Sequence, residues 1–215
     1  MSTNRRVSDP GARQGPRRRG RGRRPANEVR RDALDATARL LFDHGMSALS
    51  YERVAAEAAV SKTTLHKWWA SIGALAAEAY FDRVENDLRF PDTGDITDDV
   101  RSQLHAFVTL LTTGEAGRVT AEIIGAAQSD PTLQASFSVS YSRPRRALAV
   151  EAFRRAQQRG QIRQDVDPDM LVDQLWGACY HRLLIPDKPL DLDFADALVA
   201  NAIRGAQEHR GPTGP

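Results

Sequence analysis

The sequence has a single cysteine and no long apolar run, and each absence excludes a class of protein. With only Cys179, the chain can form neither an intramolecular disulfide nor a thiolate zinc cluster. Cys179 falls within an apolar helical pattern, which favours a buried small hydrophobe over a reactive thiol. No segment approaches the roughly 20 apolar residues that cross a bilayer, and no apolar segment of a secretory signal follows the arginine-rich N-terminus. We therefore expect a cytoplasmic protein with no membrane partner.

Signatures of catalysis and of cofactor binding are also lacking. The five histidines never pair on one helical face, and neither a glycine-rich phosphate loop nor a nucleophile motif occurs. The closely spaced acids Asp165 and Asp167 precede a predicted helix, where N-terminal capping explains them. We predict no catalytic residue, no metal and no cofactor; the alternative is an all-α enzyme.

Charge is distributed very unevenly along the chain. Residues 1–26 hold nine arginines and one acid, a charge near +8, so the remainder carries about −6 of the net +2. This segment has almost no aliphatic side chains and cannot bury enough apolar area to order itself, so we predict a disordered arm. A basic arm on a mildly acidic body indicates an anionic partner: DNA, RNA or an anionic membrane.

From Asn27 onward the apolar residues recur at helical spacing, which predicts an all-α fold of about nine helices. Asn27 is the predicted cap of a first helix that ends at Gly45. Ser50 and Ser61 can cap two short helices, the second ending at Trp68 or Trp69. Together these helices form a first module over residues 27–70.

A second module is predicted over residues 71–210. Ser71 can cap a fourth helix that runs to about Arg89, where residues 90–94 break the pattern. Glycine and proline breaks then separate helices predicted near residues 95–113, 115–128, 131–158, 168–185 and 191–208.

The two short helices have the lengths of a helix-turn-helix, in which the second helix enters the major groove of DNA. Val54, Ala58 and Leu65 can face a shared core. The side chains left outward are donors that suit phosphates and base edges: Lys62, Thr63, Thr64, His66 and Lys67.

The run Ala33–Leu75 resembles the DNA-binding domain of the TetR/AcrR family of regulators. The matching elements are Leu34-Asp35-Ala36 with Leu40, Leu41 and Gly45, then Val54-Ala55-Ala56, Val60-Ser61-Lys62 and Thr64-Leu65. The later motifs are similar to a C-terminal ligand-binding domain of that family: residues 128–131, 144–146, 159–163 and 165–168. The resemblance covers nearly all of residues 27–208.

This resemblance implies a DNA-binding transcriptional regulator, more commonly a repressor. It places Lys62, Thr63 and Thr64 at bases or nearby phosphates, and Lys67 at the backbone. The remaining residues that we expect at this DNA-binding site are Ser50 and His66, the latter standing where the family usually has tyrosine.

Two other positions depart from the family pattern. Ala59 occupies a turn position that is commonly glycine, with a steric cost if its φ is positive. Ile72 replaces a common lysine, so one expected phosphate contact is missing.

The arginine arm can supply the missing affinity. Our hypothesis is that Arg21, Arg23 and Arg24 enter the minor groove beside the first helix. The alternative is that the arm adds only non-specific affinity and solubility. The arm also fits an alternative function for the chain, a non-specific or architectural nucleic-acid-binding protein. That alternative gives the C-terminal half no function.

In the family, an apolar cavity in the C-terminal domain takes an apolar or amphipathic ligand whose identity the sequence leaves open. Aromatic and aliphatic residues at helical spacing are candidates to line it, although plain core is the alternative for each: Phe107, Leu111, Ile124, Phe137, Phe153, Trp176 and Tyr180.

The resemblance also implies a homodimer on a palindromic operator. The last two predicted helices carry wide apolar stripes that suit a four-helix seam. The candidate interface residues are Leu171, Leu175, Ala178, Leu198 and Ala202.

Overall fold

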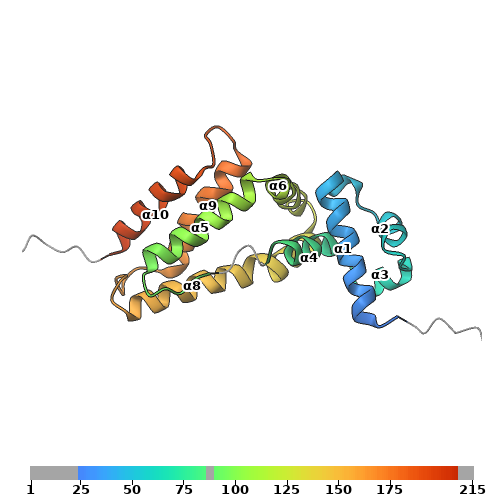
Figure 1. Ribbon diagram of the computed structural model, residues 1–215, viewed down its shortest axis with the longest axis horizontal. Helices are drawn as coiled ribbons and strands as arrows, with labels where there is room; N and C mark the ends of the chain where they lie inside the picture. Colours follow the sequence, from blue (N-terminus) through green and yellow to red (C-terminus); the bar gives the residue numbers. More distant parts are fainter. Residues whose placement is uncertain (1–23, 86–89, 208–215) are drawn as a thin grey trace, which may run out of the picture.

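The computed structural model describes residues 24–85 and 90–207, and every regular element within these ranges is a helix (Figure 1). The N-terminal helices are α1 (Ala26–His44), α2 (Tyr51–Ala58), α3 (Lys62–Trp68) and α4 (Ile72–Val84), with a 3₁₀ turn at Met46–Ala48. They are followed by α5 (Ile96–Thr112), α6 (Ala116–Ala127), α7 (Pro131–Phe137), α8 (Arg143–Gln158), α9 (Pro168–Leu184) and α10 (Leu192–Ala206).

A π-helical segment, Ser138–Ser142, joins α7 to α8 without a break. The predicted helix over residues 131–158 is therefore one continuous element with a wider turn inside it. If this element is counted once, the described residues contain nine helices, so the all-α prediction is confirmed. A π turn changes the direction in which side chains leave a helix and is frequent at functional sites.

Most of the predicted helix caps are present. The side chains of Ser50, Ser61 and Ser71 accept backbone N–H groups at the starts of α2, α3 and α4. The predicted cap at Asn27 was wrong, because α1 already begins at Ala26 and its N-cap is Pro25. Proline leads directly into a helix since its φ is fixed near the helical value and it has no N–H to satisfy.

Several predictions fall on residues outside the described ranges. These include nearly all of the arginine arm, with Arg21 and Arg23, and the expected end of the fourth helix near Arg89. The boundary between the two modules at residue 70 stays a prediction.

One end of the molecule is formed by α1, α2 and α3, and α4 leads from them to the remaining helices (Figure 1). Leu41, Val54, Leu65 and Trp69 are buried in this end, which fixes α3 against α1 and α2. In α4, Gly73 has no side chain to separate it from α7, where the Leu133 side chain would lie about 3.0 Å from an added Cβ. Helix α4 therefore packs against α7 as well as against α1, and it connects the two ends of the molecule.

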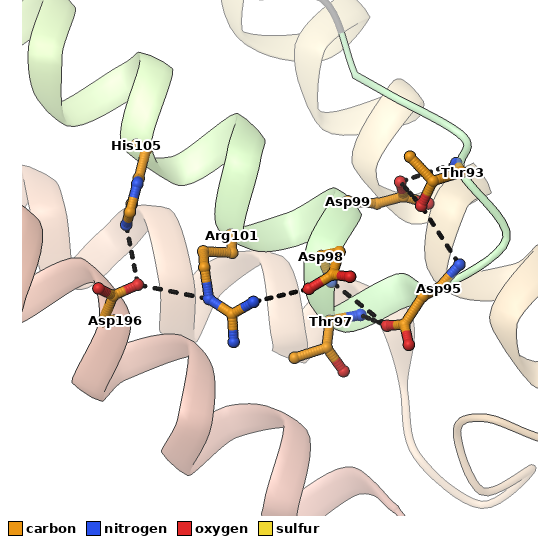
Figure 2. Close-up of polar contacts among 8 residues, drawn as sticks. All are labelled: Thr93, Asp95, Thr97, Asp98, Asp99, Arg101, His105 and Asp196. Carbon is orange, nitrogen blue, oxygen red and sulfur yellow. Dashed lines mark hydrogen bonds and ion pairs between the residues drawn. The ribbon is translucent and has the colours of Figure 1, made fainter.

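At the other end, α10 packs along α5 and α9. Figure 2 shows a polar network on this seam, in which the Asp196 carboxylate of α10 accepts from His105 at 2.8 Å and pairs with Arg101 at 3.4 Å. The Asp99 carboxylate is buried and accepts both the backbone N–H and the hydroxyl of Thr93, which fixes the loop before α5. Within residues 24–85 and 90–207, none of the helices combines the length and apolarity that crossing a membrane requires.

Candidate nucleic-acid interface and effector cavity

The turn between α2 and α3 depends on a strained alanine. Ala59 adopts φ 50° and ψ 44°, the left-handed region that glycine normally occupies. Its backbone N–H closes α2 onto Ala55 and Ala56, and the Val60 N–H then returns to the Ala55 carbonyl at 3.0 Å. This geometry turns the chain sharply enough to place α3 across α2.

Helix α3 presents a polar face to solvent. Lys62, Thr63, His66 and Lys67 are exposed, whereas Thr64 is half-buried and its hydroxyl lies 2.8 Å from the Ser61 hydroxyl. Only three lysines occur in the whole chain, and two of them lie on this helix. The sequence predicted this outward face, and the structure brings its residues together on one helix beside the N-terminus of α2.

Lys62 is already ion-paired within the protein. Its ammonium lies 2.7 Å from the Glu52 carboxylate of α2. The hydrogen bond from Lys62 lowers the pKa of Glu52, and the pair is solvent-exposed. Contact between Lys62 and a phosphate would therefore require the lysine to exchange one anionic partner for another.

Tyr51 is a member of this surface that sequence reasoning missed. The His66 ring packs against the Tyr51 ring with centroids 3.8 Å apart, and the Tyr51 hydroxyl donates to the Trp69 carbonyl at 2.8 Å. These contacts fix His66 on the exposed side of α3. The sequence could have suggested this contact in part, because Tyr51 is the first residue of α2 and His66 lies about one turn into α3.

The flanking predicted residues lie at two helix starts. Ser50 is half-buried and its side chain is occupied by capping the Arg53 N–H. Arg24 is exposed immediately before α1 and is ion-paired with Asp32.

Two sets of contacts connect α1 and α3 to the rest of the molecule. Glu78 of α4 accepts from the Trp69 indole at 2.8 Å and from Arg30 at 2.5 Å, and the Arg30 guanidinium also lies 4.7 Å from the centre of the Trp69 ring. The end of α1 contacts α6, because Arg118 donates to the Phe42 carbonyl.

A cavity of about 220 Å³ lies in the C-terminal half among α5, α8 and α9. We call it the effector cavity, and its lining residues are Phe90, Gln103, Phe107, Tyr141, Ser142, Arg145, Arg146, Leu148, Ala149, Val172, Asp173, Trp176, Gly177 and Tyr180. Three of the seven residues predicted to contact ligand are among them: Phe107, Trp176 and Tyr180.

The structure does not bring the other four predicted residues to this cavity. Leu111 lines a separate open hollow beside residues 182–190. Phe153 is fully buried core and Ile124 is half-buried on α6. Phe137 stacks on Tyr141 with ring centroids 5.0 Å apart but does not line the cavity.

The polar part of the cavity wall was missed by sequence reasoning. Tyr141 lies in the π-helical segment, and Arg145 follows one turn later on α8. Burial lowers the pKa of Arg145 and raises the pKa of Tyr141 well above its usual value. The motif at residues 144–146 marked this stretch, but a π turn cannot be identified from helical spacing.

The five candidate interface residues lie in two kinds of position. Leu171 and Leu175 are buried within the chain, at 4% and 0% exposure, so they have almost no surface to give to a partner. Ala178, Leu198 and Ala202 are only half-buried on α9 and α10.

Comparison with known proteins places this architecture among bacterial regulators. Residues 33–79 match the family described as "Bacterial regulatory proteins, tetR family", and residues 90–202 match "Tetracyclin repressor-like, C-terminal domain". The chain is 30% identical over 187 residues to the uncharacterized HTH-type transcriptional regulator YdeS of Bacillus subtilis (strain 168), with 87% of this chain and 94% of YdeS covered. It is 29% identical over 172 residues to the uncharacterized HTH-type transcriptional regulator Rv1556 of Mycobacterium tuberculosis (strain ATCC 25618 / H37Rv), with 80% of this chain and 84% of Rv1556 covered. The crystal structure of the TetR family transcription regulator SCO0332 matches with a TM-score of 0.77 at 52% identity, covering 84% of this chain and all of that one.

Proposed function

This chain belongs to the TetR family of bacterial transcriptional regulators, and on that premise we propose that it is a dimeric repressor released from its operator by a small ligand in the effector cavity. DNA binding and regulation of transcription are properties of the family. The repressive mode, the dimer and the response to ligand are the proposal. Its cellular location would be the cytoplasm, where its DNA target lies.

The observation that carries the proposal is the exposed polar face of α3. We propose that Lys62 and Thr63, at the N-terminus of the helix, contact bases or adjacent phosphates and that Lys67 contacts the backbone. Glu52 would repel phosphates, so the pair with Lys62 has to open or tilt on DNA. This local repulsion disfavours non-specific sites, at which Lys62 gains no base contact in return.

We propose that Ser50, Thr64 and His66 also contact DNA. The Ser50 and Thr64 hydroxyls lie at the starts of α2 and α3, where helix N-termini favour phosphate oxygens. The arginine arm, with Arg21, Arg23 and Arg24, would add minor-groove contacts.

Ligand binding would reach α3 through α4. Tyr141 of the cavity wall contacts Tyr80 of α4 edge-on with centroids 5.5 Å apart, and Glu78 on the same helix accepts from the Trp69 indole at the end of α3. Displacement of Tyr141 therefore pushes on the helix that holds α3, whereas the α1–α6 contact through Arg118 resists rotation at the other side. A shift of this kind alters the spacing of two recognition helices in a dimer.

The dimer would be formed by α9 and α10, using their outward residues rather than those buried in the chain. Ala178, Leu198 and Ala202 lie half-buried on these helices, and the exposed Leu184 and Leu192 extend the apolar surface at their ends. Small residues permit close helix approach across such a seam.

The test is fluorescence anisotropy of the full chain on labelled DNA from beside its own gene, against a scrambled fragment, at several salt concentrations. We expect a preference of about 10³ or more with two chains per site. Lys67→Ala should weaken binding and reduce the log-log salt slope by about 0.9, as for one lost phosphate contact. Lys188→Ala is the matched control, because Lys188 is exposed in the loop between α9 and α10.

Equal affinity for the two fragments with a steep salt slope would contradict sequence-specific regulation and favour the architectural alternative. A single chain per site in sedimentation velocity would contradict the dimer.

A further inference from the structure

The effector cavity has an aromatic wall and a small volume. Phe90 and Trp176 lie at a tilt with ring centroids 6.3 Å apart, and Phe107 meets Tyr180 edge-on with centroids 5.4 Å apart. A volume of about 220 Å³ exceeds the roughly 150 Å³ that holds one benzene molecule but lies below the roughly 300–1,000 Å³ of sites for drug-sized ligands. The cavity therefore suits a ligand with one flat aromatic ring and a short substituent.

The lining divides into an exposed rim and a buried floor. Leu148, Asp173 and Gly177 are exposed, so the cavity opens to solvent between α8 and α9. Gln103 and Phe107 of α5, at 2% and 1% exposure, lie at the closed end. A polar group at the rim can bind solvent water, whereas a polar group at the floor depends on whatever fills the cavity. The floor therefore decides which ligands are accepted.

Gln103 is the floor residue with hydrogen-bond donors to spare. Its carbonyl accepts from the Trp176 indole at 3.2 Å, and this bond orients the amide. The amide NH₂ carries two N–H donors, and no residue in the described parts of the chain accepts from them. The phenols of Tyr141 and Tyr180, by contrast, interact with each other. The floor therefore offers a ligand an N–H donor on a fixed side chain.

The charged side chains of the lining are already engaged within the protein. Asp173 pairs with Arg146 at 2.5 Å, and Arg146 is also held by Asp169 at 2.7 Å. Arg145 has interactions of its own, and its guanidinium lies 6.0 Å from the centre of the Tyr141 ring. A charged ligand would have to give up its hydration without gaining an uncommitted opposite charge, which is costly among apolar side chains. The wall therefore favours an uncharged ligand.

We propose that the ligand of this cavity is a small uncharged aromatic carbonyl compound, bound with its ring among the aromatic side chains and its carbonyl oxygen at the Gln103 amide. A carbonyl oxygen only accepts hydrogen bonds and needs no counter-charge, so it matches a neutral N–H donor. The flat ring can meet the faces and edges of the aromatic wall. A hydrocarbon of the same shape would fill the space but leave the Gln103 NH₂ without a partner. This inference rests on the proposed function, since it names the ligand class of the same site.

The experiment compares ligands of nearly equal shape by isothermal titration calorimetry on the full chain. Acetophenone carries the ring and the carbonyl, α-methylstyrene replaces the carbonyl oxygen by CH₂, and benzoate and benzamidinium add a negative or a positive charge. We expect acetophenone to bind about tenfold or more tighter than either ion. The proposal is overturned if benzoate or benzamidinium binds as tightly as acetophenone, or if acetophenone does not bind at about 5 mM.

Gln103→Met separates the hydrogen bond from the shape of the cavity. Methionine is close to glutamine in volume and has no N–H group, so acetophenone should bind about tenfold more weakly, whereas α-methylstyrene should bind no more weakly than before. Gln174→Met is the matched control, because Gln174 is exposed on α9 and does not line the cavity, so neither affinity should change. Unchanged acetophenone affinity in Gln103→Met, or an equal loss for both ligands, would overturn the proposal. The comparison with the two ions uses the unsubstituted chain and does not depend on this variant.

Failure here is distinguishable from failure of the proposed function. DNA affinity and stoichiometry are measured by anisotropy without ligand, and acetophenone is then added to the bound complex. Specific DNA binding together with no preference for the uncharged carbonyl compound overturns only the ligand class. Loss of sequence preference on DNA overturns the regulator itself, whatever the calorimeter shows.

Discussion

Replacing Ala59 by glycine should stabilise the protein. Ala59 has φ 50°, and an L residue in the left-handed region costs roughly 1–2 kcal/mol that glycine avoids. Glycine also gains unfolded-chain entropy worth about 0.4–1 kcal/mol, which opposes the benefit. The Ala59 side chain is exposed, so little packing is lost. We expect a net gain of about 0.5–1 kcal/mol in the free energy of unfolding.

The same substitution three residues earlier provides a matched control. Ala56 is exposed in the regular part of α2, where glycine in place of alanine costs about 0.5–1 kcal/mol. Each variant removes one methyl group, within α2 at Ala56 and at the C-cap of α2 at Ala59, but the two should change stability in opposite directions.

Urea denaturation followed by circular dichroism measures both variants, and thermal scans should show a shift of about 2–4 °C for each kcal/mol in a chain of this size. Ala59→Gly should leave DNA affinity unchanged, because the turn keeps its conformation. If Ala59→Gly lost as much stability as Ala56→Gly, the backbone at Ala59 would not be left-handed and the explanation of the turn would be wrong.

Three further outcomes follow from the packing and charge of the described residues. Gly117→Ala should destabilise the protein by about 1–3 kcal/mol or more in urea denaturation, since the new Cβ would lie 2.0 Å from a carbonyl oxygen in the last turn of α5. Gly125→Ala on the same helix meets open space and should stabilise by about 0.5–1 kcal/mol. Cys179 should resist iodoacetamide in the native protein and react in denaturant, because burial raises the pKa of its thiol to about 12; rapid native labelling would contradict this. The hydrogen bond from Arg159 lowers the pKa of Asp92, so their pair stabilises the fold at neutral pH and is lost as the pH falls through that lowered pKa. Asp92→Asn should therefore reduce stability at neutral pH but not in strong acid, as compared by urea denaturation at the two pH values.

Local rules were sufficient for most helix limits. Ser50, Ser61 and Ser71 were identified as caps because a short hydroxyl before an apolar helical pattern has few other uses, and the structure confirms all three. Asn27 was misassigned because Pro25 starts α1 without a side-chain cap. The π turn at residues 138–142 was not predictable, since one extra residue per turn is invisible in an apolar repeat.

Sequence and tertiary structure thus decided different things about this protein. Helical periodicity, caps and the polar run from Lys62 to Lys67 determined an all-α chain with a helix-turn-helix, because these are interactions between near neighbours. Which aromatic residues meet around a cavity depends on how α5, α8 and α9 cross. Phe107 and Trp176 lie 69 positions apart in sequence and share that cavity, whereas the similar Phe153 is plain core. Only the packed fold could make that distinction, since burial beside a void and burial in the core select the same apolar side chains.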